Sequence, residues 1–531
     1  MYLCVFEFLP VELIHEIFHY LWAHEIYYGF SQLSAYVDSV LINYKRYSIS
    51  LSSMLKHQFD LMCQLIRPEQ VISITIAENN DTPDQSNLFF SKFDILQFIN
   101  LRSFAIISSD QSIFRQLSLL CQFNNFQSLT LPHISSTYWC HFGSQVEIIL
   151  PRLRQLITNQ CPLSKPLNNL KYLTVTHCYC YNLGYLFRQM PNLSSLNITI
   201  SLDVFTQWSE KVSVMNYLRR LILCIDYGRL TMGRMNQFLS KLPCLMHFEL
   251  QITDPIDIVG GTQWTQWSRH LNVDVEDVKD IIDGHQWKYS VSHLQTFDFR
   301  FCLSHKSSEQ ILDSFRSSFW LEQKQWFVAY DDHQSSPCLF TVPRFAPKNI
   351  IYSSNYRTLP CTSSDLYFDQ FVDILTLPTL CPLKHRFINV TSLVSQTYNT
   401  ISLDQILPFL QLPRLQSLAF VNAPVLTKNI FQSIRSLTIN RTVMKYSAEQ
   451  ICIVFPRLER LYIKIDDPDT MLLLIDRLKH VSIVTFVYCQ SSLFKDLTHE
   501  WFIQNSTRLM ANNNFTCHKN GDKIHLWMDV T

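Results

Sequence analysis

Glycine is scarce in this chain, with 9 residues in 531, where an average protein has about 7%. Neither GxGxxG nor GxxxxGK occurs, so the glycine-rich loops that usually hold nucleotide phosphates are missing. This argues against nucleotide-dependent enzymes. Basic and acidic residues number 44 each, and the formal net charge is zero. We therefore expect neither nucleic acid nor an anionic membrane as a partner.

Long apolar runs and a disulfide framework are also missing. No apolar run approaches the roughly 18–20 residues that a membrane-spanning helix needs. Glu7 and Pro10 interrupt the apolar start, and no basic segment precedes it, so we expect no secretory signal. The 16 cysteines are scattered along the chain. Their distribution predicts reduced thiols in the cytoplasm and/or nucleus.

What the chain does contain is a short apolar motif that recurs from about residue 68 onward. Its form is Leu-x-x-Leu-x-Leu with conservative substitutions. Most neighbouring copies start 17 to 30 residues apart, in or near the range of short structural repeats. The copies begin at Val71, Leu101, Phe126, Leu153, Leu170, Leu193, Leu218, Leu245, Leu294, Val390, Leu415, Ile434, Leu458 and Val481.

Two further details favour a repeat of helix and strand. Proline ends a helix and leads into an extended segment, and Pro-x-Leu precedes several copies, at Pro151, Pro191, Pro243, Pro413 and Pro456. An Asn or Cys three residues past the last apolar position can satisfy the backbone of a turn, and this slot holds Asn79, Cys161, Cys178, Cys302 and Cys489. These features resemble the leucine-rich-repeat family. The resemblance implies an α/β solenoid with parallel strands on the concave face and helices on the convex face.

Within each strand, alternate side chains point to opposite faces. We expect the second and third apolar positions of each motif in the core and the residues flanking the last two on the concave surface. A long surface of aromatic, charged and polar side chains suits protein recognition, although the same residues would serve an ordinary solvated sheet face. The candidates for binding a target protein are Tyr172, Thr174, Arg220, His247, Glu249, Gln251, Asp298, Arg300, Arg460, Tyr462 and Lys464.

The motif is lost between residues 303 and 389. SEQILDSFRSSFWLEQKQ predicts an amphipathic helix, and two strands are expected from Trp326 and Cys338. The segment is either an insertion or a run of degenerate repeats that keeps the solenoid continuous, and we prefer the second interpretation.

At the end of the chain we expect a helix over THEWFIQNSTRLM and a hairpin around Asn520-Gly521 that caps the last repeat.

The residues near the N-terminus predict a short helix that binds another protein. Pro10 suits its first turn, and an apolar stripe follows through Leu13, Ile17 and Leu21, with Ile14 and Phe18 beside it. Few residues precede this helix, so the stripe needs cover from the rest of the chain or from a partner. The matching positions of a longer pattern are Leu9, Pro10, Glu12, Leu13, Ile17, Phe18, Tyr20, Leu21, Glu25, Ile26, Phe30 and Leu33.

This pattern resembles the F-box motif over about 45 residues, up to Leu33 most closely. In that family the apolar positions bind the Skp-type adaptor of a cullin ubiquitin ligase. The resemblance implies that the same adaptor, and through it a cullin, is a partner of this chain. The adaptor-binding residues that it implies are Leu9, Pro10, Leu13, Ile17, Phe18 and Leu21.

Two groups of residues partly match the sequence patterns of zinc sites. His15, Glu16 and His19 match HExxH, the zinc-protease signature, but too few residues precede them to frame such a helix with a sheet. Cys161, His177, Cys178 and Cys180 lack the paired CxxC spacing of structural zinc sites. We expect no metal, no cofactor and no catalytic residue. A zinc hydrolase is kept as the enzyme alternative.

The sequence as a whole predicts a non-catalytic substrate receptor of a Skp–cullin–F-box ubiquitin ligase with an unidentified target protein. The alternative is a leucine-rich-repeat scaffold without a link to ubiquitin, whose N-terminal helices only cap the solenoid. The predicted domains are an F-box (1–50), a connecting helix (51–68), repeats (69–302), an irregular segment (303–389), repeats (390–490) and a C-terminal helix with a capping hairpin (491–531).

Overall fold

The chain folds into two compact units, each built from separate stretches of sequence. Unit 1 contains Met1–Ile113, Pro347–Tyr356 and Asp369–Thr531, and unit 2 contains Phe114–Ala346 and Arg357–Phe368. The computed structural model describes residues 5–52, 54–77, 82, 84–107, 119–132, 148–159, 166–179, 183–201, 213–227, 230–256, 281–303, 309–332, 337–352, 359–363, 368–379, 387–397, 414–424, 430–488, 497–511 and 514–529.

All fourteen copies of the apolar motif lie in β-strands, as predicted. In β7 (Ser195–Ser201) the residues alternate between buried and half-buried, with Leu196, Ile198 and Ile200 in the core. This alternation follows from the two-residue period of a strand. The second and third apolar positions of the motif are therefore core residues, as expected. The fold is mixed α/β with long sheets of parallel strands, the arrangement of a leucine-rich-repeat-like solenoid.

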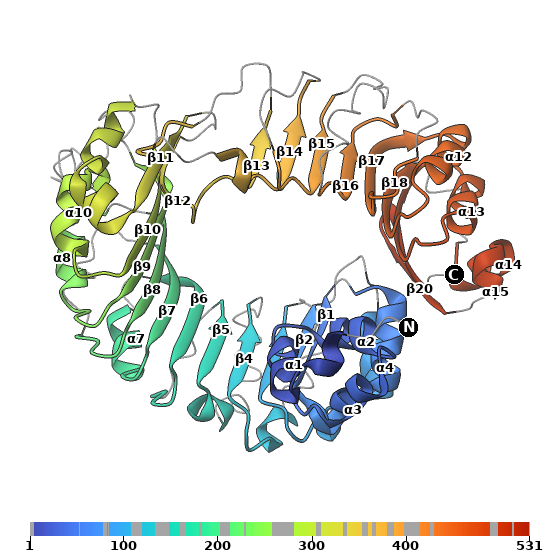
Figure 1. Cartoon of the computed structure of the whole chain (residues 1–531), viewed down its shortest axis with the longest axis horizontal. Helices are drawn as coiled ribbons and strands as arrows, with labels where there is room; N and C mark the ends of the chain where they lie inside the picture. The colour runs from blue at the N-terminus through green and yellow to red at the C-terminus, as the bar shows by residue number, and fades with distance from the viewer. Residues whose placement is uncertain are drawn as a thin grey trace. The chain divides into compact units, whose positions relative to one another are not determined.

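Unit 2 is a curved sheet with helices on its outer side (Figure 1). The helices are α7 (Leu183–Gln189), α8 (Met232–Leu239) and α10 (Gly284–Val291). Thr231 caps α8 by accepting from Arg234 N, and the apolar side of α8 is buried. The parallel strands follow one another as β4 (Ser128–Leu131), β5 (Gln155–Thr158), β6 (Tyr172–Tyr179), β7, β8 (Arg220–Tyr227), β9 (His247–Ile256) and β10 (Thr296–Leu303).

An antiparallel hairpin ends the strands of unit 2. β12 (Cys338–Val342) pairs with β10, and β11 (Phe327–Asp331) pairs with β12. The two strands expected from Trp326 and Cys338 are thus present. Our preferred interpretation of 303–389 as degenerate repeats is wrong for the first part of this segment, because β12 is antiparallel to β10. It holds for the later part, where the strands Asn349–Ile351 and Ile374–Leu377 pair in parallel in a second sheet that leads into the following repeats. The predicted helix before them is also not a single α-helix: it is a 3₁₀ segment (Glu309–Phe315) followed by a π-helical one (Phe319–Lys324).

Unit 1 joins the two ends of the chain. Its first strands, β1 (Tyr47–Ser52), β2 (Val71–Ala77) and β3 (Ser103–Ile106), are parallel neighbours. Its second sheet begins with β13 (Asn349–Ile351) and β14 (Ile374–Leu377), which the sequence did not predict. The sheet continues with β15 (Ser392–Ser395), β16 (Ser417–Phe420), β17 (Ser436–Val443), β18 (Arg460–Ile465), β19 (Ile483–Tyr488), β21 (Lys523–Met528) and β20 (Phe515–Asn520).

Helices accompany both parts of unit 1. Near the N-terminus they are α1 (Val11–Phe18), α2 (Ala23–Phe30), α3 (Ala35–Asn43), α4 (Lys56–Leu65) and α5 (Gln85–Lys92). Near the C-terminus they are α12 (Lys445–Val454), α13 (Pro468–Arg477), α14 (His499–Asn505) and α15 (Thr507–Ala511). The helix predicted over THEWFIQNSTRLM is therefore interrupted at Ser506, whose hydroxyl donates to Asp476. The predicted boundary at residue 50 falls inside β1.

Asparagine side chains connect successive repeats at a position that the sequence analysis missed. Asn100, Asn169, Asn192 and Asn389 each come directly before the first apolar residue of a motif. Each side-chain amide donates to a backbone carbonyl of the preceding repeat, at N···O distances of 2.7, 2.8, 2.8 and 2.6 Å. These bonds satisfy carbonyl groups that the strand ladder does not use.

The predicted C-terminal hairpin is present, with a one-residue difference in its turn. Asn520 pairs with Lys523, so the loop residues are Gly521 and Asp522. Gly521 has a φ of +60°, which favours glycine at this position. The hairpin is more than a cap, because β21 is itself a strand of the sheet beside β19.

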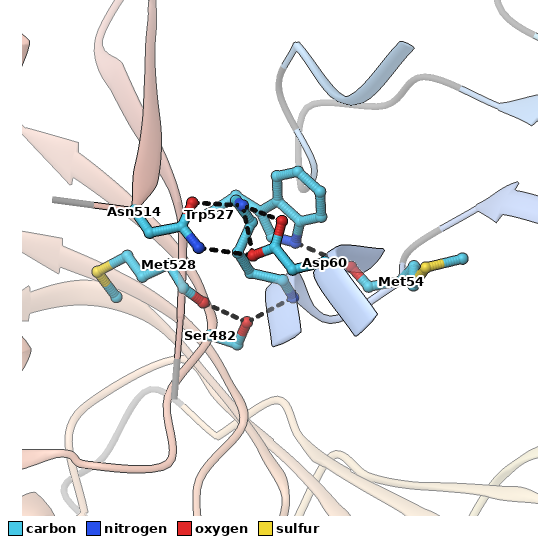
Figure 2. Close-up of polar contacts among 7 residues, drawn as sticks. Met54, Asp60, Ser482, Asn514, Trp527 and Met528 are labelled. Atoms are coloured by element: carbon cyan, nitrogen blue, oxygen red, sulfur yellow. Dashed lines mark hydrogen bonds and ion pairs between the residues drawn. The ribbon is translucent and has the colours of Figure 1, made fainter. Parts of the chain in front are cut away.

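The hairpin also binds the chain between β1 and α4, in a cluster that we call the Lys56 junction (Figure 2). Lys56 Nζ lies 2.8 Å from Asp60 and 2.7 Å from Asn514 Oδ1, and 5.2 Å from the centre of the Trp527 ring. Trp527 Nε1 donates to Met54 O at 2.8 Å, and Lys56 N donates to Ser482 Oγ at 3.1 Å. Residues more than 400 positions apart in sequence thus form one core.

Candidate functional site

The six residues implied by the F-box resemblance differ in their exposure. Leu13 is 51% exposed and Pro10 is exposed, while Leu9, Ile17 and Leu21 are half-buried. Phe18 is different, because only 1% of its surface is exposed. Its ring packs edge-on against Phe30 and Tyr44, with centroid distances of 5.2 and 5.3 Å. The expectation that Phe18 contacts a partner directly is therefore not supported.

The apolar surface around these residues is large. Of the 25 large apolar or aromatic side chains that are exposed in the described part of the chain, eight lie between Phe8 and Ile42. The N-terminal helices thus carry about a third of these exposed side chains on fewer than 40 residues. We call these eight residues the N-terminal apolar surface: Phe8, Val11, Leu13, Tyr20, Trp22, Tyr28, Leu33 and Ile42.

The buried sides of the same helices fasten them to the repeats. Ile26 and Tyr27 on α2 are in the core, and the Tyr27 ring stacks on Tyr47 of β1 at 5.0 Å. The Tyr36 hydroxyl donates to Leu9 O at 2.8 Å, which holds the chain before α1. Trp22 N donates to Glu25 Oε2 at 2.7 Å and so helps to start α2. These contacts fix the orientation of the N-terminal apolar surface.

The HExxH residues are engaged with their neighbours. The ring of His15 packs on Tyr44 at 5.1 Å, and partial burial lowers the pKa of His15. His19 Nδ1 is 3.8 Å from Glu16, and its Nε2 is 3.4 Å from the guanidinium of Arg46. A guanidinium at this distance opposes a zinc ion at the same nitrogen. Within the described residues, no three His, Cys, Asp or Glu side chains are grouped so that they could hold a metal.

The residues that we assigned to repeat turns divide into two groups. Asn79, Cys161 and Cys489 lie outside the described residues, as does Cys180 of the second metal-like group. Cys178 and Cys302 are inside β6 and β10, so the assignment to turns is wrong for these two. The strands of these repeats are longer than the motif, and their last residues still pair with neighbours.

Unit 2 brings four of the predicted recognition residues together at one pocket. In the register of the sheet Arg220 pairs with His247, and Glu249 pairs with Asp298. These side chains border a pocket of about 280 Å³ on the strand face, which we call the carboxylate pocket. Arg300 is exposed further along β10, and Tyr172, 51% exposed, is two strands away on β6.

The charges of the carboxylate pocket are partly neutralised by residues that the sequence analysis missed. Arg344 Nε donates to Glu249 Oε2 at 2.8 Å, and this hydrogen bond raises the pKa of Arg344. Gln251 donates to the other oxygen of Glu249 at 2.8 Å. Thr341 donates to Asp298 at 3.1 Å, but burial outweighs this bond and raises the pKa of Asp298. Thr341 and Arg344 come from β12 and the turn after it, which carry no repeat motif.

Unit 1 positions the third predicted group differently. Arg460, Tyr462 and Lys464 are on β18, and the ammonium of Lys523 lies 5.7 Å from the centre of the Tyr462 ring. Arg460 also borders an open pocket of about 730 Å³ together with Glu459. The other walls come from the start of α2 and from the strands β1 to β3, through Trp22, His24, Glu25, Ser50, Ser52, Met54, Leu55, Gln58, Thr75, Ala105 and Ile107.

Mixed aromatic, basic and acidic side chains with a pocket between them can recognise a folded protein or a peptide by shape and charge.

None of the helices in the described residues has the length and apolar composition needed to cross a membrane.

Comparisons with known proteins provide no basis for assigning a family or a function. No family model and no curated protein matches the chain. Among solved structures, the chain is similar to one entitled "Crystal structure of TLR13-ssRNA13 complex", with a TM-score of 0.29 and 14% sequence identity. The match covers 81% of this chain and 54% of the other, so the chain spans about half the length of that protein. A superposition with this score does not bear on function.

Proposed function

We propose that this protein is a non-catalytic substrate-recognition subunit of a Skp–cullin–F-box ubiquitin ligase. The observation that supports this best is the N-terminal apolar surface, because it lies on the segment that resembles an F-box and includes Leu13, Tyr20 and Leu33 of that pattern. Eight exposed apolar or aromatic side chains are unfavourable in water unless a partner covers them. The proposed partner is a Skp-type adaptor and, through it, a cullin.

The structure modifies the list of proposed adaptor contacts. Leu9, Pro10, Leu13, Ile17 and Leu21 stay on it, since each has surface left for a partner. Phe18 becomes a supporting residue that holds α1 against Phe30 and Tyr44.

The strand faces of the repeats would bind the target protein. The ligase would act by proximity, holding a target lysine near a ubiquitin-charged enzyme supplied by the rest of the complex. No residue of this chain would perform covalent chemistry on the target. Because the cysteines show no disulfide framework, we place the protein in the cytoplasm and/or nucleus, where such thiols stay reduced.

The test is binding of purified Skp-type adaptor to the full chain. Leu13→Ala combined with Ile17→Ala removes two contacts from α1 and should weaken binding at least tenfold, about 1.4 kcal/mol or more. Ile453→Ala is the matched control, because Ile453 is 51% exposed, as Leu13 is, and lies on α12, outside the N-terminal helices. Equal binding by wild type and the double variant, with both folded, would contradict the proposal.

A leucine-rich-repeat scaffold without adaptor is the second candidate. It is favoured by the burial of Ile26 and Tyr27 and by the stacking of Tyr27 on Tyr47, which tie the helices to the solenoid as a cap would. A cap predicts that no adaptor binds even to the wild-type chain. It also predicts that deleting residues 1–45 exposes the first strand and lowers the melting temperature.

A further inference from the structure

Two cysteines face each other across the antiparallel strands of unit 2. Cys302 on β10 pairs in register with Cys338 on β12, and their sulfur atoms are 3.5 Å apart. Both are thiols, and Cys302 keeps part of its surface exposed while Cys338 is buried. Two sulfurs in van der Waals contact need only a small side-chain rotation to come within bonding distance.

The backbone at this pair has the right geometry for a cross-link. Leu303 N donates to Pro337 O at 2.7 Å, so Leu303 and Pro337 form a hydrogen-bonded pair of the ladder. The adjacent pair, Cys302 and Cys338, is then a non-hydrogen-bonded one, because the two kinds alternate along antiparallel strands. At such pairs the Cα atoms are about 4.5 Å apart, within the range of about 4.4–6.8 Å found for disulfides.

The surroundings favour reaction at Cys302 first. The hydrogen bond with Cys338 and the neighbouring Arg300 on the same strand face together lower the pKa of Cys302 to about 7, against the opposing effect of burial. The other groups near the pair are Asp331, which pairs with Cys338 from β11, and Cys224 on β8. Burial raises the pKa of Cys224 to about 11. A thiolate is the nucleophile in oxidation, so Cys302 is the more reactive thiol of this face.

We propose that Cys302 and Cys338 form a reversible disulfide across β10 and β12 when the protein meets a hydroperoxide. With hydrogen peroxide, the Cys302 thiolate attacks one peroxide oxygen, the O–O bond breaks, and a sulfenic acid and hydroxide are formed. The hydroxide takes up the proton that the Cys302 thiol released on ionisation and becomes water. The sulfur of Cys338 then attacks the sulfenic sulfur, the S–O bond breaks, and a second water leaves with the proton of the Cys338 thiol. The two thiols lose two electrons and two protons in total, and hydrogen peroxide is reduced to water. A small thiol such as glutathione reverses the reaction by exchange.

The cross-link has a consequence for the carboxylate pocket. β12 is followed directly by the turn that carries Arg344, and Thr341 on β12 donates to Asp298. Oxidation would fix β12 to β10 and so hold Thr341 and Arg344 over the two carboxylates. The inference does not depend on the ligase function, since it concerns unit 2 alone.

The experiment treats the full chain with hydrogen peroxide, blocks the remaining thiols with N-ethylmaleimide, and maps the products by mass spectrometry after proteolysis. We expect a Cys302–Cys338 cross-linked peptide that disappears after dithiothreitol, an upward shift of the melting temperature of several degrees, and Cys224 still available for blocking. Equal oxidation of Cys224, or Cys302 oxidised while Cys338 stays reduced, would overturn the proposal.

Two variants test the order of events. In Cys338→Ser the sulfenic acid on Cys302 has no second thiol to react with, so dimedone should trap it in high yield. In the wild-type protein, dimedone should trap little of it. Arg300→Gln should slow alkylation of Cys302 by iodoacetamide several-fold at pH 7 and leave the rate above pH 9 almost unchanged. If Arg300→Gln reacts as fast as wild type at pH 7, Cys302 is not the activated thiol and the proposed sequence is wrong.

Discussion

Two antiparallel hairpins end the parallel runs of this molecule, and their chemistry differs. In unit 2, β12 and β11 follow β10, and the ion pair that they bring is only partly covered: the side chains of Arg344 and Glu249 are 52% and 9% exposed. In unit 1, β21 and β20 follow β19, and the ion pair beside them is enclosed, with Lys56 and Asp60 4% and 18% exposed. The same topology thus seals a core in one unit and leaves a pocket in the other.

The difference follows from what covers the last strand. An exposed sheet edge offers unpaired backbone groups to other chains, and a hairpin turns the edge away from the parallel run. In unit 1 a second segment, residues 54–60, packs on the hairpin, and the ring centroids of Phe59 and Trp527 are 5.1 Å apart. In the described part of unit 2 the strand face beside β12 holds the carboxylate pocket. The hairpin of unit 1 (the first hairpin) is thus part of a core, whereas the hairpin of unit 2 (the second hairpin) borders a pocket.

The largest effect is expected for Trp527→Ala. The Trp527 ring is fully buried, and its Nε1 donates to Met54 O. Its loss should destabilise unit 1 by about 4 kcal/mol, because a large cavity forms and a carbonyl loses its partner. Trp527→Phe is the control, expected to cost much less since most of the ring volume stays. Urea unfolding measures both, and similar values for the two variants would show that the hydrogen bond and not packing dominates.

Asp60→Ala should have the next largest effect. It leaves the Lys56 ammonium buried with Asn514 as its only polar side-chain partner in the junction, and removing one member of a buried ion pair costs about 3 kcal/mol. The double variant Lys56→Met, Asp60→Leu should recover most of this loss, because apolar replacement of a buried pair is often neutral. A double-mutant cycle in urea measures the coupling. A cost below about 0.5 kcal/mol for Asp60→Ala would mean that water reaches Lys56.

The strands that carry the repeated apolar motif could be predicted from the sequence, whereas contacts that occur at only one place in the fold could not. The motif strands follow from a two-residue period with apolar core positions, and this holds at Leu221 and Leu223 as at every other copy. Two strands that the analysis missed carried the same signal in weaker form. VDILTL from Val372 matches the motif and is β14, and Tyr44, Tyr47 and Ile49 match it with aromatic residues and lead into β1.

The Lys56 junction and the carboxylate pocket could not be predicted. From the sequence, Lys56 would be predicted to be an ordinary surface lysine of a helix. Its burial depends on Asn514 and Trp527, more than 450 positions away. In the same way Glu249 was predicted to be an exposed recognition residue, whereas Arg344 covers it from a segment without a repeat motif. Local patterns carry no information on such long-range partners. The F-box resemblance stays a prediction, although the burial of Phe18 changes which of its residues could meet an adaptor.

Arg344→Ala tests whether the second hairpin contributes little to stability. Solvent screens a half-exposed arginine, so its loss should cost only about 1 kcal/mol, well below the cost of Asp60→Ala. Arg316→Ala is the matched control, because Arg316 pairs with Asp313 at 2.6 Å while both side chains are exposed, and it should cost less than about 0.5 kcal/mol. Thermal unfolding of both variants provides the measurement. A loss of about 3 kcal/mol for Arg344→Ala would remove the contrast between the two hairpins.

The smallest effect, and the most specific one, is expected for Asp298→Asn as a function of pH. Burial raises the pKa of Asp298 above its ordinary value of 3.8, so the folded protein binds this proton more tightly than the unfolded chain does. The stability that this carboxyl contributes is therefore complete below pH 3.8 and is lost as the pH rises through the folded pKa. The asparagine variant lacks this loss while it can still accept the hydrogen bond from Thr341. Its melting temperature should match that of wild type at pH 3 and exceed it at pH 7 by the equivalent of about 1 kcal/mol or less. A variant that matches wild type at pH 3 but is less stable than wild type at pH 7 would show that the carboxylate is favoured in the pocket, and that Arg344 balances two carboxylates there, not one.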